Sequence, residues 1–325
     1  MRVLMVTTPL PTSVRPGSMA PAARQFASML TVGVEVEILE VKGIKGLKYL
    51  QCQPRLSTLA ASVDLIHAHY GYCGWLARSQ FRKPVVVSFM GDDLLGTPDV
   101  AGRASLFSKI VVQLDRWFAH TTDAVIVKSA EMAKIVAPVK AHIIPNGVDL
   151  ETFQPTNADE ARAQLGLDAH KRYVLFPGRP SEPRKGFALA QAVMAKVSTL
   201  LAQPLELLTL WGVAPDRVPL YMNACNAMLL TSFWEGSPNV VKEAMACNTP
   251  VVSVAVGDVP ELLAAVEGCT VCPRDVDVLA DTLVKMLNTA TRSAGRSALK
   301  RKGLDLCSTA QKIKAVYQDV LGRSA

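Results

Sequence analysis

The stretch Ser232–Pro250 reads SFWEGSPNVVKEAMACNTP and joins a tight turn to the start of a helix. Pro238 suits the first helical position because it has no N–H to satisfy there, and Ser237 before it is a suitable helix cap. The free amides at the start of such a helix form a site for a phosphate group. Glu235 precedes the helix and Glu243 lies within it, so one carboxylate could meet a sugar and the other a ribose. Taken alone, the stretch is explained more simply as an amphipathic helix with two ordinary surface glutamates.

Length and composition indicate two globular domains in a reducing compartment. The chain has 325 residues, 50% of them hydrophobic, which is enough for two cores. No uncharged apolar run reaches the roughly 18 residues of a membrane span. The start MRVLMVTTPLP is typical of a first strand and not of a signal peptide. Seven irregularly spaced cysteines favour a cytoplasmic protein, and Cys269 and Cys272 lack the further ligands of a zinc site.

Positive charge is concentrated in the first half of the chain. Residues 1–150 hold 16 Lys/Arg and 11 Asp/Glu, giving +5, whereas the remainder holds 19 and 17, giving +2. A basic half favours an anionic partner there, such as a membrane surface or a phosphorylated acceptor. Nucleic acid is not the expected partner, because no nucleic-acid-binding motif is present and aromatic residues make up only 6% of the chain.

Short apolar runs that alternate with polar loops and helical patterns predict a parallel sheet in each half. The predicted strands are residues 3–7, 34–41, 64–68, 85–89 and 124–128, then 173–176, 205–210, 227–230, 251–254 and 270–272. No GxGxxG follows the first strand, so a nicotinamide or flavin cofactor is not expected. We predict domains at 1–150 and 151–305, and an amphipathic C-terminal helix, 306–325, that packs back on the first domain.

Two strand ends in the first half carry polar residues, and ligands of open α/β sheets bind at such ends. His67 and His69 end one strand, but residues two apart in a strand face opposite ways, so a metal-binding pair is not expected. The next strand ends in Met90-Gly91-Asp92-Asp93. This acidic pair could form a metal site or a polar loop that caps a short helix, and we favour the loop.

The segment Arg103–His120 has a helical pattern of apolar residues, with Lys109 and Arg116 among them. Most such helices pack on a sheet. A role at a membrane surface is the alternative that this segment leaves open.

In the second half, the strand at 173–176 ends in Pro177-Gly178-Arg179, and the loop that follows holds Lys185. Arginine offers a planar fork and lysine a point charge to a diphosphate group. Basic residues in loops are usually just solvated, but the acidic helix start at Ser232–Pro250 favours a shared anion site.

Four motifs in this order resemble the retaining glycosyltransferases of family 4, which have the GT-B fold of two Rossmann-like domains facing a central cleft. IPNGVD (Ile144–Asp149) is similar to the interdomain segment, and PGR with RKG to the pair that meets the donor phosphates. EGSPNVVKEAMACNTPVV is similar to the E-x7-E segment, and VGDVPE to the loop that follows it. The resemblance covers nearly the whole chain and is densest over residues 177–261.

The resemblance implies transfer of a sugar from a nucleotide-diphosphate sugar to a glycan, lipid-linked or small-molecule acceptor, without a metal or other cofactor. Arg179, Lys185 and Glu235 would be catalytic, the basic pair acting on the leaving diphosphate and Glu235 on sugar hydroxyls, while Glu243 would contact the ribose. The implied donor-binding residues are Gly17, Arg179, Lys185, Glu235, Gly236, Ser237, Pro238, Asn239, Val240 and Glu243. The residues implied at the acceptor or in the cleft are His69, Met90, Asp92, Asp93 and Asn146.

The chain departs from the family pattern in four places. Met90 stands where the family usually has a His near the reacting sugar, and Gly17 stands in place of a Gly-Gly pair. Asn248 replaces a glycine, a mild change because Asn also accepts a positive φ. The connection from Leu210 to the helix at Val218 is short, so one βα repeat of the second domain is predicted to be missing or compressed.

Two alternatives stay open: a nucleotide-sugar-binding GT-B protein without catalysis, which Met90 favours, and a GT-B sugar-nucleotide epimerase. The resemblance and the basic first half together favour a cytoplasmic enzyme of polysaccharide biosynthesis, with peripheral contact at the inner face of the membrane. No motif specifies the nucleobase, the sugar, the acceptor or the oligomeric state.

Overall fold

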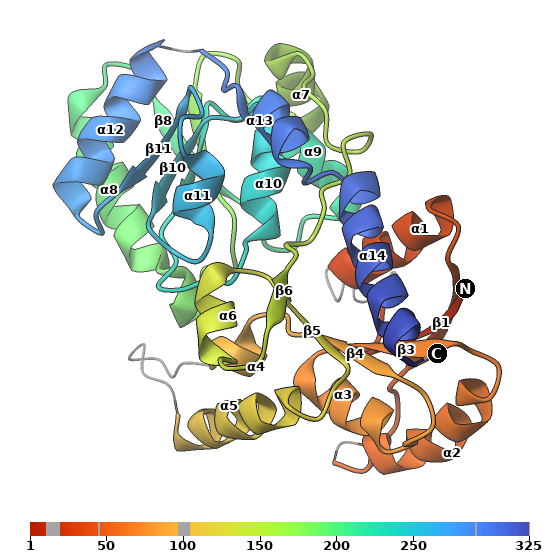
Figure 1. The fold of residues 1–325 in the computed structure, drawn as a ribbon. Coiled ribbons are helices and arrows are strands. Elements are labelled where there is room, and N and C mark those ends of the chain that lie inside the picture. Colours follow the sequence, from red (N-terminus) through yellow and green to blue (C-terminus); the bar gives the residue numbers. More distant parts are fainter. Residues whose placement is uncertain (11–19, 45, 97–104, 290, 325) are drawn as a thin grey trace. The chain divides into compact units, whose positions relative to one another are not determined.

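The computed structural model describes residues 1–10, 20–44, 46–96, 105–289 and 291–324, which fold as two compact α/β units (Figure 1). The first unit comprises Met1–Thr97, Ala104–Gly147 and Leu306–Ala325, and the second unit comprises mainly Val148–Asp305. No described helix combines the length and the apolar composition that crossing a membrane would need.

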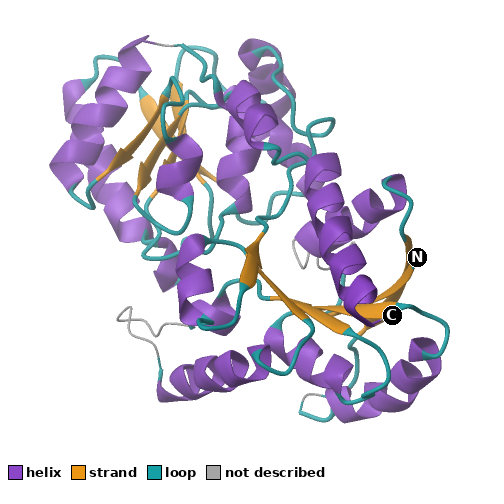
Figure 2. Cartoon of the chain, viewed as in Figure 1, coloured by secondary structure: helices purple, strands orange, loops and turns teal. Residues whose placement is uncertain are grey.

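A six-stranded parallel sheet forms the middle of the first unit (Figure 2). Its strand order is β2-β1-β3-β4-β5-β6, with β1 at Arg2–Thr7, β2 at Glu35–Glu40, β3 at Leu65–His69, β4 at Val85–Ser88, β5 at Ala124–Val127 and β6 at Ala141–Ile143. β3, β4 and β5 are buried along their whole length, as strands covered on both faces are. Because these strands pair in parallel, their carboxyl ends meet at one edge of the sheet, where His69 pairs in register with Ser88.

Helices cover both faces of this sheet. They are α1 (Ala20–Thr31), α2 (Lys48–Ala60), α3 (Gly71–Arg78), α4 (Asp92–Leu95), α5 (Leu106–Ala119), α6 (Ala130–Ile135) and α14 (Leu306–Ser324). Alternate residues of β1 point to opposite faces. Val3 and Met5 pack in a cluster with residues of α1 and α14, whereas Leu4 and Val6 pack with residues of α2 and α3.

The C-terminal helix α14 belongs to the first unit although it follows the second unit in the chain. Ile313, Val316 and Tyr317 are buried in the cluster that covers one face of the first sheet. The Tyr317 hydroxyl lies 2.6 Å from Nδ1 of His67, whose Nε2 lies 2.8 Å from the hydroxyl of Ser88. This buried polar contact joins α14 to β3 and β4.

The second unit contains a five-stranded parallel sheet in the order β11-β10-β9-β7-β8. The strands are β7 (Arg172–Phe176), β8 (Leu205–Thr209), β9 (Ala227–Leu230), β10 (Val251–Val254) and β11 (Cys269–Cys272). The helices are α7 (Ala158–Leu165), α8 (Phe187–Leu200), α9 (Val218–Ala224), α10 (Asn239–Ala246), α11 (Val259–Leu263), α12 (Val276–Thr289) and α13 (Gly295–Lys302). A large apolar cluster links the strands to helices α8 to α13.

Every strand predicted from the apolar runs overlaps an observed strand, and only the short β6 was not predicted. Between β8 and β9 the chain forms a 3-10 turn, η2 (Pro215–Arg217), and α9, with no further strand. This agrees with the predicted compressed connection.

Candidate functional site

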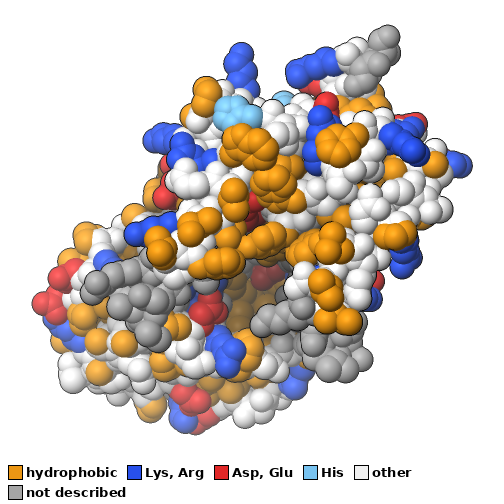
Figure 3. All heavy atoms as spheres, turned by 90° about the horizontal axis from the view of Figure 1, so that it is seen from below, with side chains coloured by type: hydrophobic (Ala, Val, Ile, Leu, Met, Phe, Trp, Pro, Cys, Tyr) orange, Lys and Arg blue, Asp and Glu red, His pale blue; other side chains and the backbone are white. Residues whose placement is uncertain are grey.

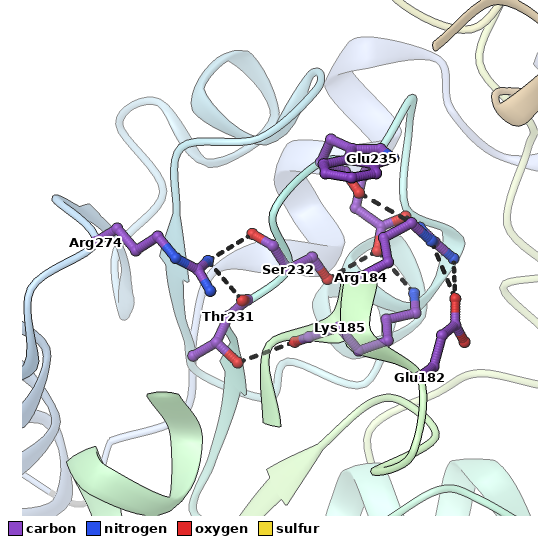
Figure 4. Close-up of polar contacts among 8 residues, drawn as sticks. Glu182, Arg184, Lys185, Thr231, Ser232, Glu235 and Arg274 are labelled. Carbon is purple, nitrogen blue, oxygen red and sulfur yellow. Dashed lines mark hydrogen bonds and ion pairs between the residues drawn. The ribbon is translucent and has the colours of Figure 1, made fainter. Parts of the chain in front are cut away.

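Glu235 is the centre of a charged cluster at the carboxyl edge of the second sheet (Figure 4). It lies in the loop after β9, and its carboxylate accepts hydrogen bonds from Lys185 Nζ at 2.7 Å and Arg184 Nη1 at 2.8 Å. The hydroxyl of Ser232 donates a third, also at 2.8 Å. Both cations come from η1 (Pro183–Lys185), a 3-10 turn in the loop that follows β7. The loops after two neighbouring strands thus meet at one carboxylate.

The cluster keeps Glu235 ionised in a buried place. Its side chain is only 9% exposed. Burial by itself raises the pKa of Glu235, but the charges of Lys185 and Arg184 and the hydrogen bonds outweigh it and lower the pKa below its ordinary value. Lys185 and Arg184 therefore face one buried carboxylate with little water around it, where an incoming phosphate could compete with that carboxylate for the two cations.

The structure brings Arg184, and not Arg179, to Glu235. Arg184 also donates to Glu182 Oε1 at 2.9 Å. The Nε of Arg179 instead donates to the hydroxyl of Ser181 at 2.7 Å, and its guanidinium lies 4.6 Å from the ring centre of Trp211. Arg184 was not among the site residues predicted from the sequence. The adjacent basic residues of the RKG motif were the signal that could have indicated it.

Hydrogen bonds from side chains to backbone carbonyls hold the two loops of the cluster against each other. The hydroxyl of Thr231 donates to the carbonyls of Lys185 at 3.2 Å and Gly186 at 3.0 Å. Arg274 donates to the carbonyls of Thr231 at 2.7 Å and Ser232 at 3.0 Å, as Figure 4 shows. Gly186 has a φ of +65°, and a Cβ there would collide with the Thr231 carbonyl and approach Arg274. Only glycine fits this turn without a shift of the loop.

The start of α10 differs from the predicted cap. Pro238 takes the cap position with φ −68° and ψ 114°, an extended conformation, so the helix begins one residue later, at Asn239. The prediction that Ser237 caps the helix is wrong, because no side chain caps it. The hydroxyl of Ser237 instead accepts a 3.0 Å hydrogen bond from Nζ of Lys242, a lysine that is fully buried.

The loop after β10 packs on this turn. The backbone N–H of Asp258 donates to the carbonyl of Gly236 at 3.2 Å. A Cβ on Gly257 would collide with the same carbonyl. The Asp258 carboxyl is buried, which raises its pKa to about 6 against the opposing effect of Lys242. Residues of the EGSPN and VGDVPE motifs, which are separate in sequence, therefore lie in contact at this edge of the second unit.

The other predicted donor residues are distributed around this edge. Gly236, Ser237 and Pro238 form the turn, and Asn239 and Val240 start α10. Glu243 is half-buried one turn further along α10. The predicted donor residue Gly17 lies outside the described residues.

His69, the first of the predicted acceptor or cleft residues, is fully buried at the end of β3. Neither ring nitrogen has a hydrogen-bond partner. Burial, aided by the nearby charge of Lys128, lowers the pKa of His69 to about 3, so the imidazole is neutral. Its ring centre lies 4.6 Å from that of His67.

The loop after β4 is held by Asp93. Its carboxylate accepts the backbone N–H groups of Met90 at 3.0 Å and Gly91 at 2.9 Å, and the side chain of Asp92 beside it is exposed. Burial raises the pKa of Asp93 to about 6. Asp93 thus acts as the loop and helix-start residue that the sequence favoured over a metal ligand. Asn146 is buried next to Gly147, the residue at which the Ala104–Gly147 segment of the first unit ends.

The fold is that of GT-B glycosyltransferases, as predicted. Sucrose-phosphate synthase from Thermosynechococcus elongatus matches with a TM-score of 0.80 at 18% identity, over 99% of each chain. The Anabaena protein Alr3699/HepE in complex with UDP matches with a TM-score of 0.73 at 20% identity, over 98% of this chain and all of that one.

The chain belongs to glycosyltransferase family 4. The model described as Glycosyltransferase Family 4 matches residues 16–152, and that described as Glycosyl transferases group 1 matches residues 195–289. D-inositol 3-phosphate glycosyltransferase of Rhodococcus erythropolis is 27% identical over 69% of this chain and 62% of its own length. The Mycobacterium avium protein of the same name is 28% identical over 81% of this chain and 73% of its own. The chain thus spans about three-fifths of the length of the Rhodococcus relative.

Proposed function

We propose that the chain transfers a sugar, with retention of its anomeric configuration, from a nucleoside diphosphate sugar to a glycan, lipid-linked or small-molecule acceptor of polysaccharide biosynthesis. The observation that carries the proposal is the cluster of Lys185, Arg184 and Glu235, which joins the loops after β7 and β9. Glu235 directly precedes the turn that starts α10, where backbone amides favour a phosphate. The names of the D-inositol 3-phosphate glycosyltransferase relatives support the same class of reaction.

The cations of the cluster would act on the leaving diphosphate. Negative charge grows on that group as the bond to the sugar breaks, and preorganised cations in a buried site stabilise growing charge most effectively. Lys185 and Arg184 are held by hydrogen bonds in such a place. Arg179, the arginine of the PGR motif, would join them once its guanidinium leaves Ser181 and Trp211.

The two glutamates would hold the donor. The ionised carboxylate of Glu235 can accept hydrogen bonds from sugar hydroxyls when Lys185 turns to the phosphate, and Glu243 would accept those of the ribose. Because side chains of the chain itself supply the positive charge, the proposed reaction uses no metal or other cofactor.

A nucleotide-sugar-binding protein without catalysis is the second candidate, and Met90 favours it. A thioether lacks the strong hydrogen-bonding capacity of the imidazole that the family usually has at this position. Asp92 and Asp93 follow Met90 in the same loop, and Asp93 already binds the loop amides.

The test is a panel of nucleoside diphosphates and their sugars. Three of the Anabaena HepE structures hold UDP, UDP with glucose, or UDP-glucose, so the uridine series comes first, followed by GDP and ADP. The nucleotide that is bound should raise the melting temperature by mass action. Transfer to an acceptor with a retained anomer, read by NMR, would support the enzyme. Binding with slow hydrolysis and no transfer would support the second candidate, and no binding of any nucleotide would contradict both.

A further inference from the structure

Helix α5 carries apolar side chains on its outer face as well as on its inner face. On the inner face, Phe118 is buried and stacks on Trp75 of α3, with ring centres 4.7 Å apart. The large apolar residues of the outer face, which we call the α5 face, are Leu106 (76% exposed), Phe107 (71%), Ile110 (51%), Leu114 (51%) and Trp117 (60%). Positions 107, 110, 114 and 117 follow the helical repeat and so share one side. Several large apolar side chains exposed on one side of a helix are typical of an interaction site.

A second exposed apolar group lies on the neighbouring helices. Tyr72 on α3 is 45% exposed, and its ring centre lies 5.9 Å from that of Tyr49 on α2. At the start of α2, Leu47 and Leu50 are 50% and 72% exposed. Figure 3 looks at the side of the molecule on which α2, α3 and α5 lie in Figure 1, and shows hydrophobic side chains gathered there with lysines and arginines around them.

The charged groups of α5 are basic on the outside. Lys109 is exposed and Arg116 is partly exposed. Asp115, the acidic residue of the helix, is buried and accepts a 3.1 Å hydrogen bond from the indole of Trp75. Lys48 begins α2 beside the second apolar group. The α5 face therefore presents apolar side chains with positive charge and no exposed carboxylate of its own helix.

We propose that the α5 face docks on a lipid bilayer that carries anionic headgroups. Large aliphatic and aromatic side chains with interspersed lysine and arginine are the composition of helices that lie in the lipid interface. Trp117 has the ring type that gathers at that interface. A second copy of this chain fits less well, because a two-fold contact through α5 would bring two sets of Lys109 and Arg116 together without an acidic partner on the helix.

The proposal goes beyond sugar transfer and is tested without it. The full chain is sedimented with vesicles of phosphatidylcholine alone and of equal parts phosphatidylcholine and phosphatidylglycerol. We expect binding to the anionic vesicles that weakens with added salt, because salt screens the attraction to the headgroups. The double substitution Phe107→Ser with Ile110→Ser should lower the partition coefficient at least about tenfold, since binding scales with the apolar area inserted.

A matched control removes apolar side chains from the second unit. Leu200 on α8 and Val278 on α12 are 51% and 41% exposed, and Leu200→Ser with Val278→Ser should leave vesicle binding unchanged. Lys109→Gln with Arg116→Gln should weaken binding and flatten its salt dependence. Melting temperatures check that all variants fold. The proposal is overturned if the wild-type chain binds neither vesicle, if the control loses as much binding as the α5 variant, or if Phe107→Ser with Ile110→Ser converts a dimer to a monomer in sedimentation velocity.

Discussion

The ammonium of Lys185 lies 2.7 Å from the carboxylate of Glu235. The group proposed to meet the donor phosphate and the group proposed to meet the donor sugar are thus each other's partners in this structure. Donor binding would exchange this one ion pair for two new contacts, so neither charge is left buried and unpaired at any stage.

Lys185→Ala is expected to slow sugar transfer by about two to three orders of magnitude, because loss of one preorganised donor to the developing charge has an effect of that size. Nucleotide binding should change much less, which calorimetry with the nucleoside diphosphate would show beside the turnover number. Lys171→Ala is the control, since Lys171 is a lysine of the same unit that pairs with Glu206 at the surface. Wild-type turnover in Lys185→Ala would remove the phosphate role.

Glu243→Ala is expected to weaken nucleotide-sugar binding about tenfold, the size of one lost hydrogen bond to a charged group. Turnover at a saturating donor concentration should stay near the wild-type value, because the ribose contact is the same in the ground and transition states. Glu267→Ala, which changes an exposed glutamate of the same unit, serves for comparison. Equal donor affinity in the two variants would refute the ribose assignment.

Arg184→Ala should lower the free energy of unfolding by about 1–3 kcal/mol, because it leaves a buried carboxylate with one cation in place of two. Arg179→Ala should change it by less than about 0.5 kcal/mol, since its partners are exposed. Urea unfolding of both variants measures the difference. A larger loss in Arg179→Ala would mean that the contacts of Arg184 with Glu235 do not stabilise the fold.

Gly186→Ala tests the loop that carries Lys185. The added methyl group meets the Thr231 carbonyl and requires a left-handed backbone, so we expect more than about 2 kcal/mol of destabilisation and a fall in activity. Gly212→Ala is the matched variant, because Gly212 also has a positive φ (+79°) but nothing within 4 Å of the new Cβ. It should cost about 1 kcal/mol. Equal urea midpoints would show that the close packing at Gly186 is unimportant.

Asp115→Asn tests a carboxyl group below the α5 face. Burial, with a smaller effect of Asp93, raises the pKa of Asp115 to about 7 in spite of the hydrogen bond from Trp75. Between about pH 4 and pH 7 the folded state therefore keeps a proton that the unfolded state has lost, so Asp115 makes stability fall as the pH rises. The variant lacks this effect and should gain stability relative to the wild type from about pH 5 to pH 8. Stability that changes in parallel with pH in the two proteins would contradict this expectation. Asp93, whose pKa is also raised, is present in both.

The positions of the loops could be predicted from the sequence, because buried parallel strands appear as short apolar runs. Each run ends where a loop begins at the carboxyl end of the strand. In this way Lys185 was placed in the loop after the strand at 173–176, and its charge was paired with the acidic helix start that holds Glu235. The identity of the family rested on the same loops.

The partners within the loops could not be predicted, because they depend on backbone turns that residue type does not specify. Arg179 and Arg184 lie in one loop, and the 3-10 turn at Pro183–Lys185 decides which of them reaches Glu235. Lys242 sits in a helix where a lysine is expected to face water, yet its ammonium is buried against Ser237. That contact occupies the hydroxyl that was expected to cap α10.

The first unit is discontinuous in sequence, since α14 returns to cover part of one face of the first sheet. The second unit is continuous from Val148 to Asp305, where its two ends meet as a parallel bridge. During synthesis the strands of the first sheet leave the ribosome long before Ile313 and Tyr317, which cover part of the sheet, have been synthesised. The second unit can thus complete its core first, which reverses the usual N-terminal-first order of co-translational folding. A nascent chain that stalls before α14 would expose the apolar side of β1 and β3 to chaperones.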